Sequence, residues 1–301
     1  MFPLVLNDSD VRDHLDAATA VAAVRSALLA HHAGTLHAPP RTRADLGEGD
    51  LVFTTGHLSA QGLFGFRVYD TFAGAEQLVA VWDAGSGRLR ALVHGTELGP
   101  RRTGAIGAVA VDTAANPGPV RVGLVGTGTQ AWTQLWALRA VRPIEDVTVA
   151  SRRPQHATDF ARRATEELKV PIRAVSRVED AVRGRDVVIV ATNSTEPVLE
   201  ADWITPGTHV STLGPKSIPH HEIPPTLEAR AHLTFTDSLA QAASYPEPHV
   251  FATDRMADLG AILAGAAPGR TDPDQITVFC SVGLAGTEVA VAAALCDAVP
   301  Q

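Results

Sequence analysis

Cysteines are scarce in this chain and long apolar runs are missing, and each of these absences excludes a class of protein. The two cysteines, Cys280 and Cys296, stand apart in apolar surroundings without a Cys-x-x-Cys motif, which indicates reduced core thiols and excludes a disulfide framework. No segment runs eighteen apolar residues, and the first residues carry no basic leader. We therefore expect a cytoplasmic protein with no membrane partner.

Clusters of charge and of metal ligands are missing as well. The formal net charge of -8 is spread along the chain without an acidic tail or a basic block, so we expect no nucleic-acid partner. None of the 12 histidines lies in an HExxH motif, and no set of histidines and carboxylates has metal-ligand spacing. The sequence therefore indicates no catalytic metal.

The chain is rich in apolar residues, and their spacing predicts its organisation. With 301 residues, 45% of them hydrophobic and 19% charged, it can bury a large core and is expected to form two domains. Residues 10–33 place apolar side chains at helical spacing, with Asp10 or Thr19 as the candidate helix start. Four short apolar runs between residues 51 and 93, separated by turn signals, predict an antiparallel meander.

A different architecture is predicted after a break in the chain. A small-residue helix runs from about Arg102 to Ala114, and Asn116-Pro117-Gly118-Pro119 marks the first domain boundary. Apolar strands then alternate with amphipathic helices, which predicts an α/β fold with a doubly wound parallel sheet of the Rossmann type. The last helix, residues 282–295, is rich in alanine and nearly uncharged, so we expect it to be buried against the first domain.

The turn after the first of these strands has the composition of a dinucleotide site. Residues 120–125 run directly into a GxGxxA motif and then into an apolar helix, the order that binds a pyrophosphate. Its glycines permit a tight turn and close backbone approach, and the helix N-terminus presents unpaired N–H groups. A glycine turn without a ligand is the simpler alternative. The predicted cofactor contacts here are Gly126, Thr127, Gly128, Thr129 and Gln130.

The end of the second strand indicates which dinucleotide is bound. An NAD enzyme usually carries Asp or Glu there for the ribose diol, whereas this chain has Ser151, Arg152 and Arg153. Two guanidiniums and a hydroxyl suit a 2′-phosphate, so NADP(H) is preferred over NAD(H), although Arg153 also fits a solvated loop. Thr192 and Asn193 end a later core strand and are predicted to lie beside the nicotinamide half, although an ordinary turn fits them equally well.

Six pieces of the sequence, in their order and spacing, resemble the ornithine cyclodeaminase/mu-crystallin family over nearly the whole chain. They are Pro40-Arg41, Gly65-Phe66-Arg67-Val68, Trp82-Asp83-Ala84-Gly85-Ser86-Gly87, Arg102-Thr103-Gly104-Ala105, Gly126-Thr127-Gly128-Thr129-Gln130-Ala131 and Val278-Phe279-Cys280-Ser281-Val282-Gly283-Leu284-Ala285. The resemblance implies a Rossmann NADP-binding domain at residues 118–278. It also implies an α+β substrate-binding and dimerisation domain, formed by residues 1–117 with residues 279–301, and a homodimer.

The resemblance also implies a carboxylate clamp. In the family, two arginines and a lysine hold the substrate carboxylate over the nicotinamide; Arg41 and Arg102 match the arginines, and Arg67 stands at the lysine position. Each arginine alone is more often a surface ion pair, but three at matching places are not. Arg67 departs from the family because a guanidinium stays protonated and cannot shuttle a proton.

A second departure follows the fifth strand. Where cyclodeaminases carry a catalytic Asp, this chain has Lys216, which would repel the side-chain ammonium of ornithine. Lys216 would instead donate a proton to an imine or keto group or bind an acidic substrate arm, with burial beside Arg67 and Arg102 lowering its pKa. A solvated loop lysine is the alternative. His220 and His221 are further candidate proton donors, at least one of which is expected to face solvent.

These features predict an NADPH-dependent oxidoreductase acting on C–N bonds, an imine or ketimine reductase or an amino-acid dehydrogenase. Its substrate would be a small 2-imino or 2-oxo carboxylate, bound by Arg41, Arg67 and Arg102, with Arg67 and Lys216 as the catalytic residues. Two alternatives stay open. One is a deaminating cyclase of the ornithine cyclodeaminase type, and the other is a non-enzymatic NADPH-binding protein like mu-crystallin.

Overall fold

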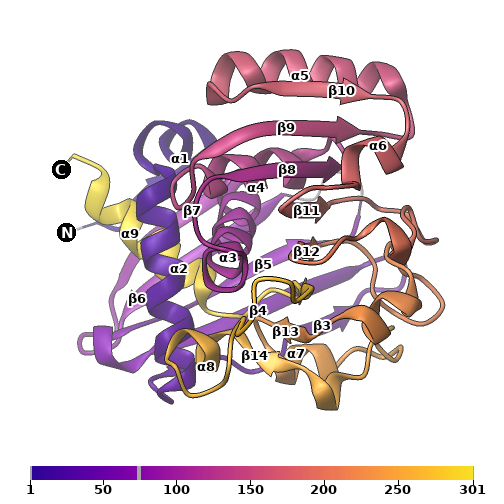
Figure 1. The fold of residues 1–301 in the computed structure, drawn as a ribbon. Helices are drawn as coiled ribbons and strands as arrows, with labels where there is room; N and C mark the ends of the chain where they lie inside the picture. The colour runs from indigo at the N-terminus through magenta and orange to yellow at the C-terminus, as the bar shows by residue number, and fades with distance from the viewer. Residues whose placement is uncertain (1, 73–75, 301) are drawn as a thin grey trace.

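The computed structural model describes residues 2–72 and 76–300, and within these residues the strands form two separate sheets (Figure 1). The first sheet has seven strands from the N-terminal third of the chain, and the second has eight strands from the remainder. Both chain termini lie on the side of the molecule where α2 and α9 are found.

The first sheet is an antiparallel meander with a parallel strand at one edge. The strands β4 (Asp50–Leu58), β5 (Leu63–Asp70), β6 (Gln77–Asp83) and β7 (Leu89–Gly95) pair in sequence order, which confirms the predicted meander. Three short strands complete the sheet: β1 (Leu4–Leu6) lies beside β7, and β2 (Leu36–His37) and β3 (Thr42–Asp45) lie beside β4. They are too short to show an apolar alternation in the sequence.

The N-terminal helical segment consists of two helices where one was predicted. α1 (Asp8–His14) begins after Asn7, whose Oδ1 accepts a hydrogen bond from the Ser9 N–H at 2.7 Å. α2 (Ala17–His32) begins after Asp16, whose Oδ1 accepts from the Thr19 N–H at 2.7 Å. The predicted starts at Asp10 and Thr19 were wrong, because the side chains that cap the free N–H groups precede them.

Two helix starts differ from the sequence prediction for local reasons. α3 (Leu98–Ala114) begins before Arg102 because Pro100 fits the first helical turn, where its missing N–H has no partner to lose. α9 (Thr287–Ala298) begins after residue 282 because Gly283 and Gly286 adopt left-handed φ angles of 84° and 80°. α9 is buried and packs against β5, β6 and β7 of the first sheet.

The second sheet is parallel throughout, in the order β10-β9-β8-β11-β12-β15-β13-β14. The chain runs outward in one direction from β8 to β10 and in the other from β11, so the carboxyl ends of β8 and β11 flank a switch point where ligands bind in such sheets. α4 and α5 cover one face, and α6 lies on the other. The predicted Rossmann-type sheet is confirmed.

The elements of this second part are bounded as follows. The strands are β8 (Val120–Val125), β9 (Ile144–Ala150), β10 (Ile172–Val175), β11 (Val187–Val190), β12 (His209–Thr212), β13 (Leu233–Thr236), β14 (Ala257–Asp258) and β15 (Thr277–Cys280). The α-helices are α4 (Thr129–Leu138), α5 (Pro154–Leu168), α6 (Val178–Val182), α7 (Leu239–Ala243) and α8 (Leu259–Leu263). Short 3-10 turns lie at Ser59–Gln61, Ala201–Trp203, Pro225–Arg230 and Thr253–Arg255.

Both cysteines lie in the core of the protein. Cys280 and Cys296 are buried and unpaired, as predicted, and burial raises the pKa of Cys280 to about 12 and that of Cys296 to about 11. Among the described residues, no group of three or more His, Cys, Asp or Glu side chains could hold a metal ion. Within that same part of the chain, no helix has the length and apolar character that a membrane span requires.

Candidate active site

Two cavities meet at the carboxyl edge of the parallel sheet. The first, of about 720 Å³, lies over the turn between β8 and α4, and we call it the glycine-turn cavity. The second, of about 730 Å³, lies between this edge and the first sheet and is lined by Arg41, Arg67 and Arg102; we call it the arginine cavity. The two share Gln130, Leu213 and Gly214 as a common wall, so groups bound in each would meet there.

The glycine-turn cavity brings together every residue that the sequence assigned to the cofactor. Its lining includes Gly126, Thr127, Gly128, Thr129, Gln130, Ser151, Arg152, Arg153, Thr192 and Asn193. At Gly126, φ is 112° and an added Cβ would lie 2.2 Å from the Ala191 carbonyl oxygen, so only glycine fits. An added Cβ at Gly128 would meet nothing within 4 Å, and no side chain caps the first turn of α4. An open backbone and free N–H groups fit a dinucleotide pyrophosphate.

Positive charge lies at the end of this cavity that follows β9. Arg152 and Arg153 are exposed, and neither guanidinium has a hydrogen bond or ion pair with any residue that the structure describes. The Ser151 hydroxyl lies 3.5 Å from the Thr127 hydroxyl. His156, in the first turn of α5, also lines the cavity and was missed by the sequence analysis; its position three residues after Arg153 was the available signal. This end of the cavity is suited to an anion.

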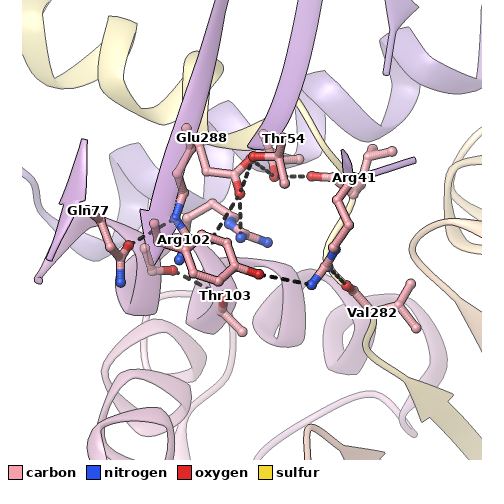
Figure 2. A network of polar contacts seen from close by, with 12 residues as sticks. Arg41, Thr54, Gln77, Arg102, Thr103, Val282 and Glu288 are labelled. Carbon is pink, nitrogen blue, oxygen red and sulfur yellow. Dashed lines mark hydrogen bonds and ion pairs between the residues drawn. The ribbon is translucent and has the colours of Figure 1, made fainter. Parts of the chain in front are cut away.

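Four arginines line the arginine cavity, and the three that the sequence analysis assigned to the substrate come from separate parts of the fold; the fourth is Arg43 on β3. Arg41 precedes β3, Arg67 lies on β5 and Arg102 lies on α3. Nη2 of Arg102 lies 2.5 Å from Oε1 of Glu288, and Nη1 of Arg67 lies 3.4 Å from the same oxygen. Arg41 donates instead to the Val282 carbonyl oxygen (Figure 2). Two guanidiniums therefore share one carboxylate, which leaves a net positive charge, and Arg41 has neutral hydrogen-bond partners.

Glu288 was missed by the sequence analysis, although it pairs with two of the three arginines predicted to bind the substrate. It is 1% exposed, and it also accepts from the Thr54 hydroxyl at 3.4 Å. Burial would raise the pKa of Glu288, but the charges of Arg102, Arg67 and Arg41 outweigh burial and hold it below its ordinary value. A lone carboxylate at the start of an apolar helix was the only signal in the sequence.

Tyrosines complete the wall around the guanidiniums. The Arg67 guanidinium lies 4.3 Å from the centre of the Tyr69 ring, and its Nε donates to Oε1 of Gln77 at 2.9 Å. Arg41 donates to the Tyr69 hydroxyl at 3.4 Å and lies 5.9 Å from the Tyr245 ring. Burial lowers the pKa of Arg67, yet a guanidinium stays charged at any ordinary pH. The arginines are therefore held as fixed cations.

Lys216 lies in the same cavity and not in a solvated loop. It is half-buried, and its ammonium donates to the Gly214 carbonyl oxygen at 2.5 Å. Burial lowers the pKa of Lys216, and the charge of Arg41 adds to the effect. The sequence analysis had expected Arg67 and Arg102 to act in this way and did not name Arg41.

Of the two candidate histidines, only His220 lines the arginine cavity. It is exposed, and its Nδ1 lies 3.7 Å from a Glu247 carboxylate oxygen, whereas the His221 ring faces the Ser217 carbonyl at 3.1 Å. A third histidine, His249, lines the cavity and was missed by the sequence analysis. Burial lowers the pKa of His249 to about 4, so its ring is neutral at neutral pH.

Comparison with known proteins identifies the family. The family model for the ornithine cyclodeaminase/mu-crystallin family matches residues 1–301. The chain belongs to this family. Alanine dehydrogenase from Archaeoglobus fulgidus is 29% identical to this family member over 307 residues, 97% of this chain and 94% of the relative. Iminosuccinate reductase from Paracoccus denitrificans is 32% identical over 228 residues, 74% of this chain and 70% of the relative.

Solved structures give the same assignment. Thermococcus litoralis Delta(1)-pyrroline-2-carboxylate reductase, solved in complex with NADH and L-proline, matches this member of the ornithine cyclodeaminase/mu-crystallin family with a TM-score of 0.89 at 27% identity. The match covers 98% of this chain and 96% of the reductase. The resemblance and the α/β fold class predicted from the sequence are both confirmed.

Proposed function

We infer that this family member is an NADPH-dependent oxidoreductase that acts on the C–N bond of a small 2-imino or 2-oxo carboxylate. The observation that carries this inference is the common wall: a cavity suited to a dinucleotide and a cavity lined by four arginines and Lys216 share Gln130, Leu213 and Gly214. Relatives named alanine dehydrogenase and iminosuccinate reductase support the reaction, and the predicted enzyme class, an NAD(P)-dependent oxidoreductase acting on C–N bonds, is confirmed.

The preference for NADPH rests on the end of β9. Arg152 and Arg153 are free to pair with a 2′-phosphate, and Ser151 offers a hydroxyl beside them. The Thermococcus litoralis reductase was solved with NADH, so the preference is proposed for this chain on its own residues. Thr192 and Asn193 would contact the nicotinamide half, which supplies the hydride when bound.

The arginine cavity would orient the substrate and deliver the proton. Arg41 and Arg102 would hold the carboxylate together with Arg67, since Arg forks match carboxylate oxygens. Reduction of a C=N bond adds a hydride to carbon and a proton to nitrogen, and the Lys216 ammonium would donate that proton. Because burial lowers its pKa toward the working pH, Lys216 is a better proton donor than an exposed lysine.

The side arm of the substrate is expected to be neutral or acidic. Glu247 is the one carboxylate among the described residues lining the arginine cavity, and it is exposed and already accepts from the Ser217 hydroxyl at 2.6 Å. Lys216 would repel an ammonium arm by about 1 to 4 kcal/mol at roughly 4 Å. This argues against ornithine as the substrate.

A homodimer is proposed through the outer face of the first sheet. α9 covers the face to which Gly65 belongs, so the alternate residues Phe64 and Phe66 point away from it. Phe64 stacks on Trp82 with ring centroids 5.5 Å apart, and Phe64 is 37% exposed. An aromatic sheet face without a covering helix is typical of a subunit interface.

Trial assays test the proposal directly. Purified protein would be mixed with NADPH and pairs of a 2-oxo acid with ammonia or methylamine, and the loss of NADPH absorbance would be followed. We expect turnover with at least one small 2-oxo acid and a higher kcat/KM with NADPH than with NADH. Absence of turnover across the panel, despite tight NADPH binding, would favour a non-enzymatic binding protein.

A further inference from the structure

Glu222 is completely buried at the junction of the two cavities, and both of its carboxylate oxygens are saturated with donors. Oε2 accepts from the Thr192 N–H at 2.8 Å and from the Thr192 hydroxyl at 2.7 Å. Oε1 accepts from the Thr212 hydroxyl at 2.7 Å, the Leu213 N–H at 2.9 Å and the Gly214 N–H at 2.5 Å. A buried carboxylate with this many partners fixes the position of each of them.

These donors belong to two chain segments that follow the neighbouring strands β11 and β12. Thr192 follows β11 and lines the glycine-turn cavity, whereas Leu213 and Gly214 follow β12 and line both cavities. The fit is tight, because a Cβ added at Gly214 would lie 2.2 Å from the Thr192 carbonyl oxygen and 2.5 Å from Oε2 of Glu222. The carboxylate therefore sets the shape of the common wall.

The same contacts extend to Lys216. Glu222 holds the N–H of Gly214, and the Lys216 ammonium donates to the carbonyl oxygen of Gly214. The backbone N–H of Glu222 also donates to the Pro215 carbonyl oxygen at 3.0 Å. This bond joins the two ends of the loop that carries Lys216. Gly214 is therefore hydrogen-bonded to both the Glu222 carboxylate and the Lys216 ammonium.

We propose that Glu222 is a positioning residue for both cavities, which fixes the wall against the nicotinamide half of the cofactor and aims the Lys216 ammonium at the substrate. The second part rests on the proposed function, because it takes Lys216 as the proton donor. The charge of Glu222 has an additional effect, since it opposes the lowering of the Lys216 pKa by burial. The other charged or titratable groups that act on Lys216 or are affected by it are Asp237, Cys280, Arg41 and His249.

The variant Glu222→Gln tests this role. Its carboxamide keeps the shape but replaces one acceptor oxygen by a donor, which must face an N–H of Thr192 or of Gly214. We expect an NADPH Kd raised about tenfold and a kcat lowered about tenfold to a hundredfold, the range for a lost charge-assisted hydrogen bond. Loss of the negative charge should also move the alkaline limb of the kcat profile to lower pH, because the Lys216 ammonium loses a stabilising neighbour.

Two further variants separate charge from geometry. Glu222→Asp keeps the charge but is too short to reach both segments, so kcat should fall while the alkaline limb stays near its wild-type position. Glu228→Gln is the matched control, because Glu228 lies on the following turn, accepts from the Ala252 N–H at 2.8 Å and lines neither cavity. It should behave as wild type in NADPH affinity, kcat and pH profile.

The outcomes distinguish this proposal from the proposed function. An active wild type, together with a folded Glu222→Gln that matches Glu228→Gln in Kd and in pH profile, would overturn the positioning role and leave the function intact. Absence of turnover in the wild type would overturn the function, and the NADPH titrations would still decide the role of Glu222 in the wall. Should Glu222→Gln not fold, Thr192→Val removes a single donor; an unchanged NADPH Kd in that variant would count against the proposal.

Discussion

Arg102 and Glu288 form a buried ion pair in which Nη2 lies 2.5 Å from Oε1, and it joins α3 to α9 (Figure 2). Both side chains are withdrawn from water, with 5% and 1% of their surface exposed. A buried pair is costly to break, because the remaining partner keeps its charge without water or a counter-ion. Glu288 therefore contributes to the stability of the fold and to the position of the clamp at the same time.

Glu288→Gln should destabilise the folded protein by about 3 to 5 kcal/mol, since Arg102 and Arg67 would lose their shared carboxylate. The pKa of Glu288 lies below its ordinary value of 4.5 in the folded state, so its contribution is complete above about pH 4.5 and is lost as the pH falls through the lowered pKa. Urea unfolding at several pH values measures this. The control Glu97→Gln removes partly exposed ion pairs with Arg12 and Arg101 and should change stability by less than about 1 kcal/mol. A loss for Glu288→Gln that does not shrink at acid pH would contradict the prediction.

Removing the two free arginines should abolish the preference for NADPH. Arg152→Ala and Arg153→Ala together are expected to raise the KM for NADPH about tenfold to a hundredfold and to leave that for NADH nearly unchanged, because only the 2′-phosphate loses its partners. Arg162→Ala is the control: Arg162 lies on α5, the helix that follows these two arginines, pairs with Asp159 at 3.0 Å and lines neither cavity. Equal losses with both coenzymes would point to a general role in binding.

Lys216→Met should lower kcat about a hundredfold to ten-thousandfold if the ammonium is the proton donor. In the wild type, activity should fall as the pH rises through the lowered Lys216 pKa, at a pH below the ordinary lysine value of 10.5, and this limb should vanish in the variant. The second lysine of the chain offers the control, since Lys169 is exposed at the end of α5. Lys169→Met should keep both the wild-type rate and the fall in activity at alkaline pH. If Lys216→Met also keeps that alkaline fall, another group must donate the proton.

The charge at position 216 should decide which substrate arm is accepted. Wild type is expected to prefer 2-oxo acids with an acidic or neutral arm over those with an ammonium arm, and Lys216→Asp should reverse the order. For each substrate, the activation free energy calculated from the ratio of kcat/KM values should change by about 1 to 4 kcal/mol, depending on how much water remains near the charge. Competition assays with paired 2-oxo acids measure the ratio. Unaltered selectivity in a folded Lys216→Asp would place the arm away from this residue.

Phe64→Glu should weaken the proposed dimer, because it puts a charge in the middle of the aromatic outer face. Leu29→Glu is the matched control, since Leu29 on α2 is 37% exposed, as Phe64 is, and lies away from this face. Light scattering during size exclusion should show a dimer for wild type and Leu29→Glu and a monomer for Phe64→Glu. A monomeric wild type, or a dimeric Phe64→Glu, would contradict the interface.

The glycine turn shows which parts of the site can be predicted from the sequence. Gly126 and Gly128 follow a strand and precede a helix within a few residues, and Arg152 follows the next strand in the same way. Local order of this kind fixes where such residues lie, because the carboxyl ends of parallel strands meet at one edge. The ten predicted cofactor contacts all line the glycine-turn cavity for this reason. The helix starts at Asp10 and Thr19 failed because competing caps nearby, Asn7 and Asp16, were equally local.

Neighbouring residues and the order of short motifs encode the alternation of strands and helices, the glycine turn and the family, so all three could be predicted before the structure was known. Only the three-dimensional arrangement shows that Glu288 pairs with both Arg67 and Arg102, that Glu222 joins the ends of β11 and β12, and that Lys216 is half-buried in the arginine cavity. The physical reason is that burial and charge pairing depend on what lies within a few ångströms in space. For Glu288 those neighbours are 186 and 221 residues away in the sequence.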